Sequence, residues 1–179
     1  NLAAAETLGS ATVIMTDKTG TLTEANMTLV DIRTLKELLI EPAPRKSMEH
    51  LKESEIHILE SALWGADVIL DDPDAPETEW HFSGRPIEAA IARAAHTQGI
   101  DVPDFGRSRA SLLTFNSTNK FSISGNHSKE IYVAVGAPDI LLARSRLPKE
   151  DYLAIESHIH AVSAEGKRLL GVARFRPEK

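Results

Sequence analysis

A change in the spacing of apolar residues near residue 110 restricts the fold more than any other feature of this chain. Before it, apolar residues recur at helical spacing, whereas residues 110–135 contain three short strand-like segments, "ASLLTF", "KFSIS" and "EIYVAV". The last two segments are joined through "GNHSK", in which Gly125 and Asn126 favour a hairpin-type turn. The pattern therefore predicts an antiparallel sheet.

Helices are predicted on both sides of this block. Residues 47–66 carry apolar side chains at helical spacing with Ser47 as the N-cap, and residues 86–98 begin with proline and are followed by glycine. The later elements predicted are a short helix over 137–145, a longer helix over 148–166 and a strand over 168–175. The predicted fold class is α/β of the α+β type, with an antiparallel sheet flanked by helices.

The N-terminal part follows a different pattern. Residues 1–9 predict a short helix, and the apolar run "SATVIMT" (10–16) predicts a buried strand that leads into a turn rich in Gly and Thr. The segment "MTLVDIRTL" (27–35) alternates well enough to predict a half-exposed strand. This first strand and turn are expected to belong to a different unit from the later sheet.

Composition excludes several classes of protein. The 179 residues include 42% hydrophobic and 26% charged side chains, as in ordinary globular domains, and no apolar run approaches the length of a membrane span. The absence of cysteine excludes a disulfide framework and a thiolate metal site, and the seven scattered histidines indicate no metal site. A net charge of −6 argues against nucleic acid as a partner.

Asp17 stands where the predicted buried strand gives way to the turn "DKTGTLT". A carboxylate at such a turn can attack an electrophile while backbone N–H groups hold the anionic part of the substrate. Gly20 permits close approach, Lys18 supplies positive charge, and Thr19 and Thr21 supply hydroxyl groups. These residues suit phosphoryl transfer to Asp17, whereas a lone turn aspartate that bonds its own backbone is the alternative.

The run "DKTGTLT" resembles the phosphorylation motif of the P-type cation-transporting ATPases at all seven positions. The resemblance implies that Asp17 is the aspartyl-phosphate nucleophile, that Lys18 and Thr19 act beside it, and that Asp17 and Thr19 hold Mg²⁺ in the full-length protein. Phosphatases of the haloacid dehalogenase group carry a second aspartate two residues after the nucleophile. Thr19 stands there instead, which implies a longer-lived intermediate.

Two later segments resemble the nucleotide-binding domain of the same family. "GRPIEAAI" resembles the family's "GDPTEGAL" segment, which implies that Glu88 faces the amino edge of adenine. "FNSTNKFSIS" resembles the family's "F-S-x-x-x-K-x-M-S" segment, which implies that Phe115 stacks on adenine and that Lys120 approaches the phosphates. Taken singly, these residues also fit a helix N-terminal acid, a core aromatic and a solvated lysine.

Two more segments complete the resemblance. "VGAPDILL" resembles the family's "KGAPE" turn at Gly136 and Ala137, with Val135 in place of the family's lysine. "GKRLLGVA" resembles the segment whose arginine reaches the phosphates, which implies that role for Arg168 and a pocket wall at Leu170. The pattern resembles the calcium, proton, magnesium and sodium–potassium pumps more than the heavy-metal exporters, whose His-Pro pair is absent.

The resemblance implies three parts. Residues 1–26 begin a haloacid-dehalogenase-like phosphorylation domain with its hinge, residues 27–174 form the nucleotide-binding domain, and residues 175–179 form the return hinge. The expected function is that of the ATP-binding cytoplasmic domain of a P-type ATPase that transports cations through an aspartyl-phosphate intermediate, with ATP and Mg²⁺ as cofactors. Its expected partners are the remaining phosphorylation domain and the membrane helices of the same longer chain.

On this interpretation the chain lies at the cytoplasmic face of a membrane and is monomeric and without turnover when isolated. Two alternatives stay open. One is a haloacid-dehalogenase-type phosphatase with a large cap, and the other is a degenerate nucleotide domain with a regulatory or interaction role, for which Val135 is the reason.

Overall fold

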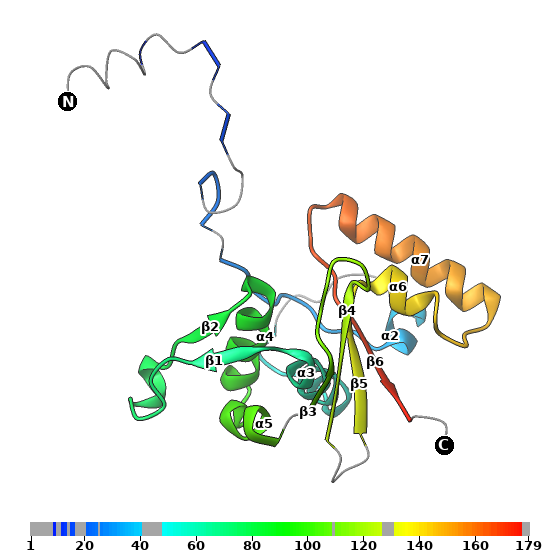
Figure 1. Cartoon of the computed structure of the whole chain (residues 1–179). Helices are drawn as coiled ribbons and strands as arrows, with labels where there is room; N and C mark the ends of the chain where they lie inside the picture. The colour runs from blue at the N-terminus through cyan, green and yellow to red at the C-terminus, as the bar shows by residue number, and fades with distance from the viewer. Residues whose placement is uncertain are drawn as a thin grey trace.

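Two antiparallel sheets with helices packed around them make up the part of the chain that the computed structural model describes (Figure 1). The described residues are 9, 12–13, 15–16, 21–24, 26–40, 48–108, 110–126 and 131–176. The helices are α2 (Leu35–Ile40), α3 (Glu53–Gly65), a 3₁₀ helix (Glu77–Glu79), α4 (Pro86–Thr97), α5 (Val102–Ser108), α6 (Pro138–Leu142) and α7 (Lys149–Ala164). The strands are β1 (Val68–Leu70), β2 (Phe82–Gly84), β3 (Ala110–Leu113), β4 (Phe121–Asn126), β5 (Ile131–Gly136) and β6 (Gly171–Phe175). The predicted α+β fold class is confirmed.

The larger sheet has the strand order β3-β4-β5-β6, and each strand runs antiparallel to its neighbours. Its register pairs Ser124 with Val133 between β4 and β5, and Val135 with Val172 between β5 and β6. Strands β1 and β2 form a separate two-stranded sheet. Since side chains alternate across a strand, Val133 and Val135 share one face, on which Trp64 packs.

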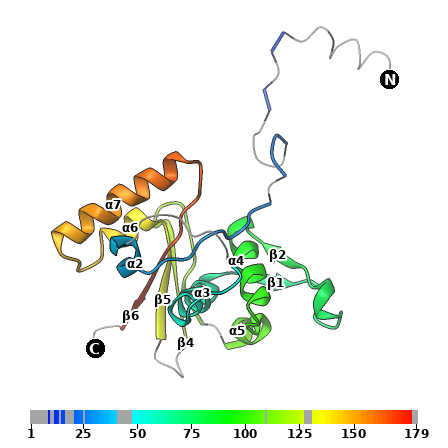
Figure 2. The ribbon, with the colours of Figure 1, turned by 180° about the vertical axis from the view of Figure 1, so that it is seen from behind.

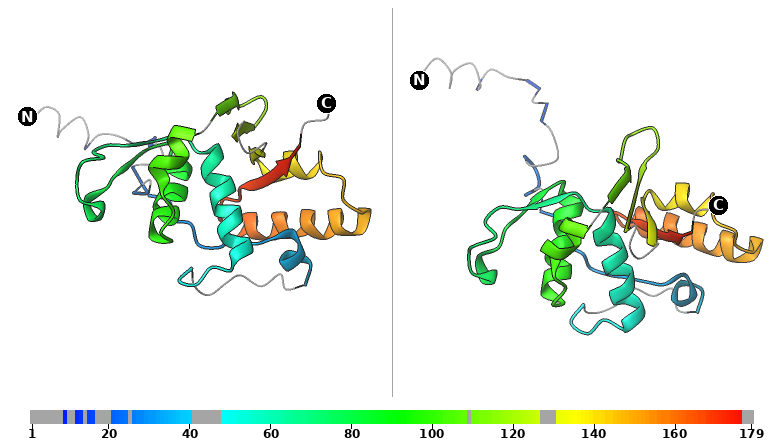
Figure 3. Two further views of the ribbon diagram at one scale, coloured as in Figure 1. Left: turned by 90° about the horizontal axis from the view of Figure 1, so that it is seen from below. Right: turned by 60° about the horizontal axis from the view of Figure 1, so that its bottom comes forward.

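Helices lie on both faces of the larger sheet. On one face α3 approaches β5 so closely that a Cβ added to Gly65 would lie 2.4 Å from Val135 Cγ2, which explains the glycine at the end of this helix. On the other face α6 packs over β6, where a Cβ added to Gly171 would lie 3.1 Å from Pro138 Cα. Figures 2 and 3 show the group α3, α4 and α5 and the pair α6 and α7 as layers on opposite sides of this sheet.

The main core lies between α3 and α4. Leu59 and Leu63 of α3 are buried against Ile91 and the small side chains Ala92 and Ala95 of α4. The alanines allow the helix axes to approach, and each buried leucine contributes roughly 1.5–3 kcal/mol. This packing places the first turn of α4, which begins the candidate site, on a rigid support.

The start of α3 differs from the prediction. The helix begins at Glu53 rather than near residue 47, and the predicted cap Ser47 lies outside the described residues. Instead, Lys52 precedes the helix and its backbone N–H donates to Glu55 Oε2 at 2.7 Å. The predicted start was wrong because apolar spacing extends into the residues before the helix, whereas the hydrogen bond from the Lys52 N–H to the Glu55 side chain marks its first turn.

Glu37 in the first turn of α2 joins α2 to the start of α3. Its carboxylate accepts hydrogen bonds from Lys52 Nζ at 2.6 Å and from the Thr34 backbone N–H at 2.9 Å. The hydrogen bond from Lys52, followed by that from Thr34, lowers the pKa of Glu37 from 4.5 to about 2. The ion pair therefore ties two helices that are separated by residues outside the described part.

The strand predicted over residues 27–35 was wrong. Residues 26–34 have no regular hydrogen-bonded pairing, and α2 begins at Leu35. The alternation that suggested a strand instead reflects a segment in which Ile32 enters the core and Arg93 of α4 donates to the Met27 carbonyl at 2.9 Å. The segment is thus held by side chains rather than by a ladder.

At the N-terminus, most residues of the predicted helix and buried strand lie outside the described residues. The described residues Val13 and Met15 are exposed and not in a strand, so they do not form the predicted buried strand. Among the described residues, no helix is long and apolar enough to cross a membrane.

Candidate functional site

The predicted phosphorylation residues Asp17, Lys18 and Thr19 lie outside the described residues, as does the magnesium site assigned to Asp17 and Thr19. Within the described part of the chain, no group of three or more His, Asp or Glu residues is placed to hold a metal ion. The site that can be described is therefore the predicted nucleotide site.

Glu88 lies in the first turn of α4, at the third helical position. Pro86 begins the helix, since its fixed φ suits this position and its missing N–H costs nothing there. The Glu88 side chain is buried, with 7% of the residue exposed, and its carboxylate is favourably placed near the positive end of the helix dipole. It is held by two hydrogen bonds from Arg85: one from Nε to Oε2 at 3.0 Å, and a second from the terminal guanidinium nitrogen to Oε1.

Phe115 follows β3 in the connection to β4 and is 42% exposed. One face of its ring is covered by Arg85, whose Cζ lies 4.7 Å from the ring centroid. A single guanidinium thus links Glu88 of α4 to Phe115, and we call Arg85, Glu88 and Phe115 the Arg85 clasp. The hydrogen bond to Glu88 is the main cause that raises the pKa of Arg85 above its ordinary value, so the guanidinium stays charged.

Lys120 ends the same β3–β4 connection in a left-handed backbone conformation, with φ of 59°. Its N–H donates to the Asn116 carbonyl at 2.8 Å, and its carbonyl accepts from the Ala137 N–H at 2.8 Å. The Asn116 side chain accepts from Thr118 and Asn119, which closes the turn. The Lys120 side chain is exposed.

Gly136 is required beside this turn. A Cβ added there would lie 2.3 Å from the Lys120 carbonyl oxygen and 2.4 Å from Phe121 Cα, closer than any side chain tolerates. We call residues 116–120 with Gly136 and Ala137 the Lys120 turn. Its backbone holds Lys120 beside the start of α6.

The structure therefore brings the predicted residues together in two groups that share the β3–β4 connection: Glu88 with Phe115, and Lys120 with Gly136 and Ala137. Arg168 and Leu170 are exposed in the segment between α7 and β6. Val135, which stands in place of the family's lysine, is only 6% exposed and packs with Trp64 on the α3 face of β5.

Sequence reasoning missed Arg85. Its signal was present in "GRPIEAAI", since the resembling segment "GDPTEGAL" has an acid where this chain has Arg85. The sequence contained no sign that Phe115, in a connection thirty residues later, would lie beneath this side chain.

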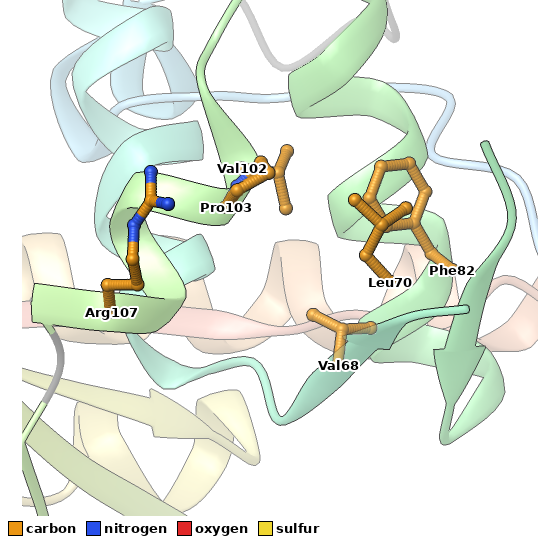
Figure 4. Close-up of a pocket in the computed structure, with 6 residues that line it drawn as sticks. All are labelled: Val68, Leu70, Phe82, Val102, Pro103 and Arg107. Carbon is orange, nitrogen blue, oxygen red and sulfur yellow. The ribbon is translucent and has the colours of Figure 1, made fainter. Parts of the chain in front are cut away.

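An apolar pocket of about 220 Å³ lies elsewhere, between the β1–β2 sheet and α5. Figure 4 shows its lining side chains: Val68, Leu70, Phe82, Val102, Pro103 and Arg107. None of the predicted nucleotide residues lines it, so this pocket and the candidate site are distinct.

Comparison with known proteins identifies the family. Residues 58–179 match the model of the P-type ATPase cytoplasmic domain N. This chain belongs to that family. The matched range contains both the Arg85 clasp and the Lys120 turn, so both lie in this P-type ATPase domain.

Several curated proteins are similar along most of the chain. Calcium-transporting ATPase 1 of Schizosaccharomyces pombe is 27% identical over 193 aligned positions that cover 96% of this chain and 21% of that protein. Calcium-transporting ATPase 1 of Lactococcus lactis is 32% identical over 149 positions, covering 80% of this chain and 16% of that protein. The sodium/potassium-transporting ATPase subunit alpha-A of Artemia franciscana is 25% identical over 197 positions, covering 98% and 20%. This chain thus spans 16–21% of the length of these relatives.

Proposed function

We propose that this domain binds ATP for a P-type ATPase that transports a cation across a membrane through an aspartyl-phosphate intermediate. The observation that carries the proposal is the juxtaposition of Glu88 and Phe115, which lie in different elements of the family-matched region and are joined by one side chain. The named relatives, which transport calcium or sodium and potassium, support a cation as the cargo.

In this proposal the adenine ring stacks on Phe115, and its amino group donates to Glu88. An aromatic ring that is 42% exposed offers a face for any base, and a buried carboxylate is an acceptor that selects a donor edge. The two residues together suit a base that presents both a flat surface and an exocyclic amino group, as adenine does.

The phosphates then extend toward Lys120 and Arg168, which are exposed cations. The Lys120 turn keeps the lysine in place through its backbone, while the charge itself sits on a flexible stem that can follow the phosphate chain. Asp17 is the proposed phosphate acceptor, with Lys18 and Thr19 beside it. Asp17 and Thr19 would hold magnesium, which would supply neutralising charge for the transferred group.

The proposed partners are the rest of the phosphorylation domain and the membrane helices of a longer chain, and the proposed place is the cytoplasmic face of a membrane. The proposed domain boundaries are residues 26/27 and 174/175, on the two segments that would link this domain to its neighbour.

Titration of the chain with ATP, ADP and AMP by NMR or calorimetry tests this proposal. We expect saturable binding by the wild type and a loss of roughly tenfold in affinity for Phe115→Ala, since stacking contributes about 1–3 kcal/mol per base. Phe175→Ala is the matched control, because Phe175 is similarly exposed but contacts Tyr132 at the other edge of the sheet. Equal affinities for the wild type and Phe115→Ala would overturn the adenine site.

The two other functions have distinct signatures in the same experiments. A haloacid-dehalogenase-type phosphatase would release phosphate from small phosphoesters, and a degenerate interaction domain would give flat titrations with every nucleotide. Val135 is the observation behind the second, because a buried valine stands where the resembling family segment has a lysine, so the cation is missing.

A further inference from the structure

Arg85 occupies the surfaces that a nucleobase would use. Its guanidinium lies over the face of Phe115 with Cζ 4.7 Å from the centroid, which is within the separation of roughly 4.5–7 Å at which aromatic rings stack. A base and this guanidinium therefore cannot both take that position on the ring.

The same side chain engages both carboxylate oxygens of Glu88. A bidentate pair between a guanidinium and a carboxylate is charge-assisted, whereas the amino group of adenine is a neutral donor. Exchange of Arg85 for a base at Glu88 is thus unfavourable unless stacking compensates for it.

We propose that Arg85 is an internal competitor for the base subsite, so that a nucleotide binds only when the guanidinium leaves the face of Phe115. The inference rests on the proposed nucleotide site and adds a residue that sets its affinity. According to this inference Arg85 lowers the affinity for the base part of the ligand, because the phosphates would lie toward Lys120 and Arg168.

Arg85 is able to leave because, within the described part of the chain, its side-chain hydrogen bonds and its ring contact are made by the guanidinium end. Its side chain is 51% exposed, whereas that of Glu88 is 9% exposed. Cation–π contacts at exposed sites are weak, and a guanidinium that moves outward returns to water. The apparent affinity is then the affinity of the open site multiplied by the fraction of molecules in which Arg85 is displaced.

The substitution Arg85→Gln distinguishes a competitor for the base subsite from a ligand of the phosphates. Glutamine keeps a hydrogen-bond donor for the buried Glu88 carboxylate but removes the charge and the flat cation from Phe115. We expect Arg85→Gln to bind adenosine, AMP and ADP about three- to tenfold more tightly than the wild type, by a similar factor for each ligand. If Arg85 were a phosphate ligand, the substitution would instead weaken ADP more than AMP and leave adenosine unchanged.

Salt provides a second readout with an uncharged ligand. Raising the ionic strength screens an ion pair whose guanidinium is half exposed, although the buried Glu88 end limits the effect, so adenosine should bind the wild type more tightly at 0.5 M salt than at 0.05 M salt, by up to about twofold. Arg85→Gln should show no such gain. Arg93→Ala is the matched control, since Arg93 lies on the same helix but donates to the Met27 carbonyl rather than to Glu88.

The deciding experiment is an NMR titration of the whole chain, as wild type, Arg85→Gln and Arg93→Ala, with adenosine, AMP and ADP at both salt concentrations. Tighter binding by Arg85→Gln alone, equal across the three ligands, supports the inference. Equal binding by all three proteins overturns the competitor and leaves the proposed nucleotide site standing, as does weaker binding by Arg85→Gln. Flat titrations with all three folded proteins overturn the proposed function and the competitor together.

Discussion

The Lys120 turn and the Arg85 clasp lie at the two ends of one short connection between β3 and β4, yet different contacts hold them. In the Lys120 turn the backbone hydrogen bonds of Lys120 to Asn116 and Ala137 set the geometry, and Gly136 permits the close approach. In the Arg85 clasp the partners meet only through side-chain atoms, and Arg85 is half exposed.

This difference suggests two roles: the Lys120 turn positions a side chain, and the Arg85 clasp affects the access of a ligand to Phe115. A turn closed by the backbone keeps its shape whether or not a ligand is present, because opening it would leave polar groups unpaired. A contact that depends on one long, half-exposed side chain can be exchanged for a ligand whose own contacts compensate for its loss. We therefore expect substitutions in the Lys120 turn to alter stability and substitutions in the clasp to alter binding.

Gly136→Ala should have the largest effect on stability. The added Cβ would meet the Lys120 carbonyl and Phe121 Cα, which are backbone atoms and cannot rotate away. We expect a loss of about 3 kcal/mol in the free energy of unfolding, measured by urea denaturation. Gly9→Ala is the control, because no atom of the described residues lies within 4 Å of the added Cβ. A loss below about 1 kcal/mol would contradict a turn held by its backbone.

Much of this fold could be predicted from the sequence. The bounds of α4 followed from its proline and glycine, and β3, β4 and β5 from the change of period, because these signals are local. The strands β1 and β2 and the helix α5 were not predicted. Strands of only three residues carry no readable period and exist because they pair with each other.

The residues of the candidate site likewise divide into those that the sequence predicted and one that it did not. Glu88, Phe115, Lys120 and Gly136 were predicted by resemblance, and the structure places them in two groups. Arg85 was missed, since its importance depends on the distance from its guanidinium to a ring thirty residues away. Such a contact depends on how α4 packs beside the sheet, which no local pattern records.

Val135→Lys should have the next largest effect. This change restores the residue of the resembling family segment, but the Val135 side chain is buried beside Trp64 and against Gly65. We expect a loss of about 2 kcal/mol in the free energy of unfolding, because an ammonium group would be taken out of water without a partner. Leu112→Lys on exposed β3 is the control and should change stability by less than about 0.5 kcal/mol.

The outcome of Val135→Lys also sharpens the comparison between the two regions. Tighter ADP binding without loss of stability would mean that the lysine reaches the site and that β5 can present side chains to it. Such a result would contradict the assignment of Val135 to the core on the α3 face.

The Glu37–Lys52 ion pair is a reference for contacts held by side chains, and its expected effect is the smallest. Because the folded pKa of Glu37 is lowered from 4.5 to about 2, its contribution is fully present above pH 4.5 and is lost as the pH falls toward 2. We expect Glu37→Gln to lower the free energy of unfolding by about 1 kcal/mol at pH 7, since Lys52 is largely exposed and solvent screens the pair. Urea denaturation from pH 7 to pH 2 should show the difference between the two proteins closing below pH 4.5. A difference that persists at pH 2 would mean that Glu37 acts through packing rather than charge. Side-chain ion pairs in this domain would then be harder to displace than the proposed exchange of Arg85 for a base requires.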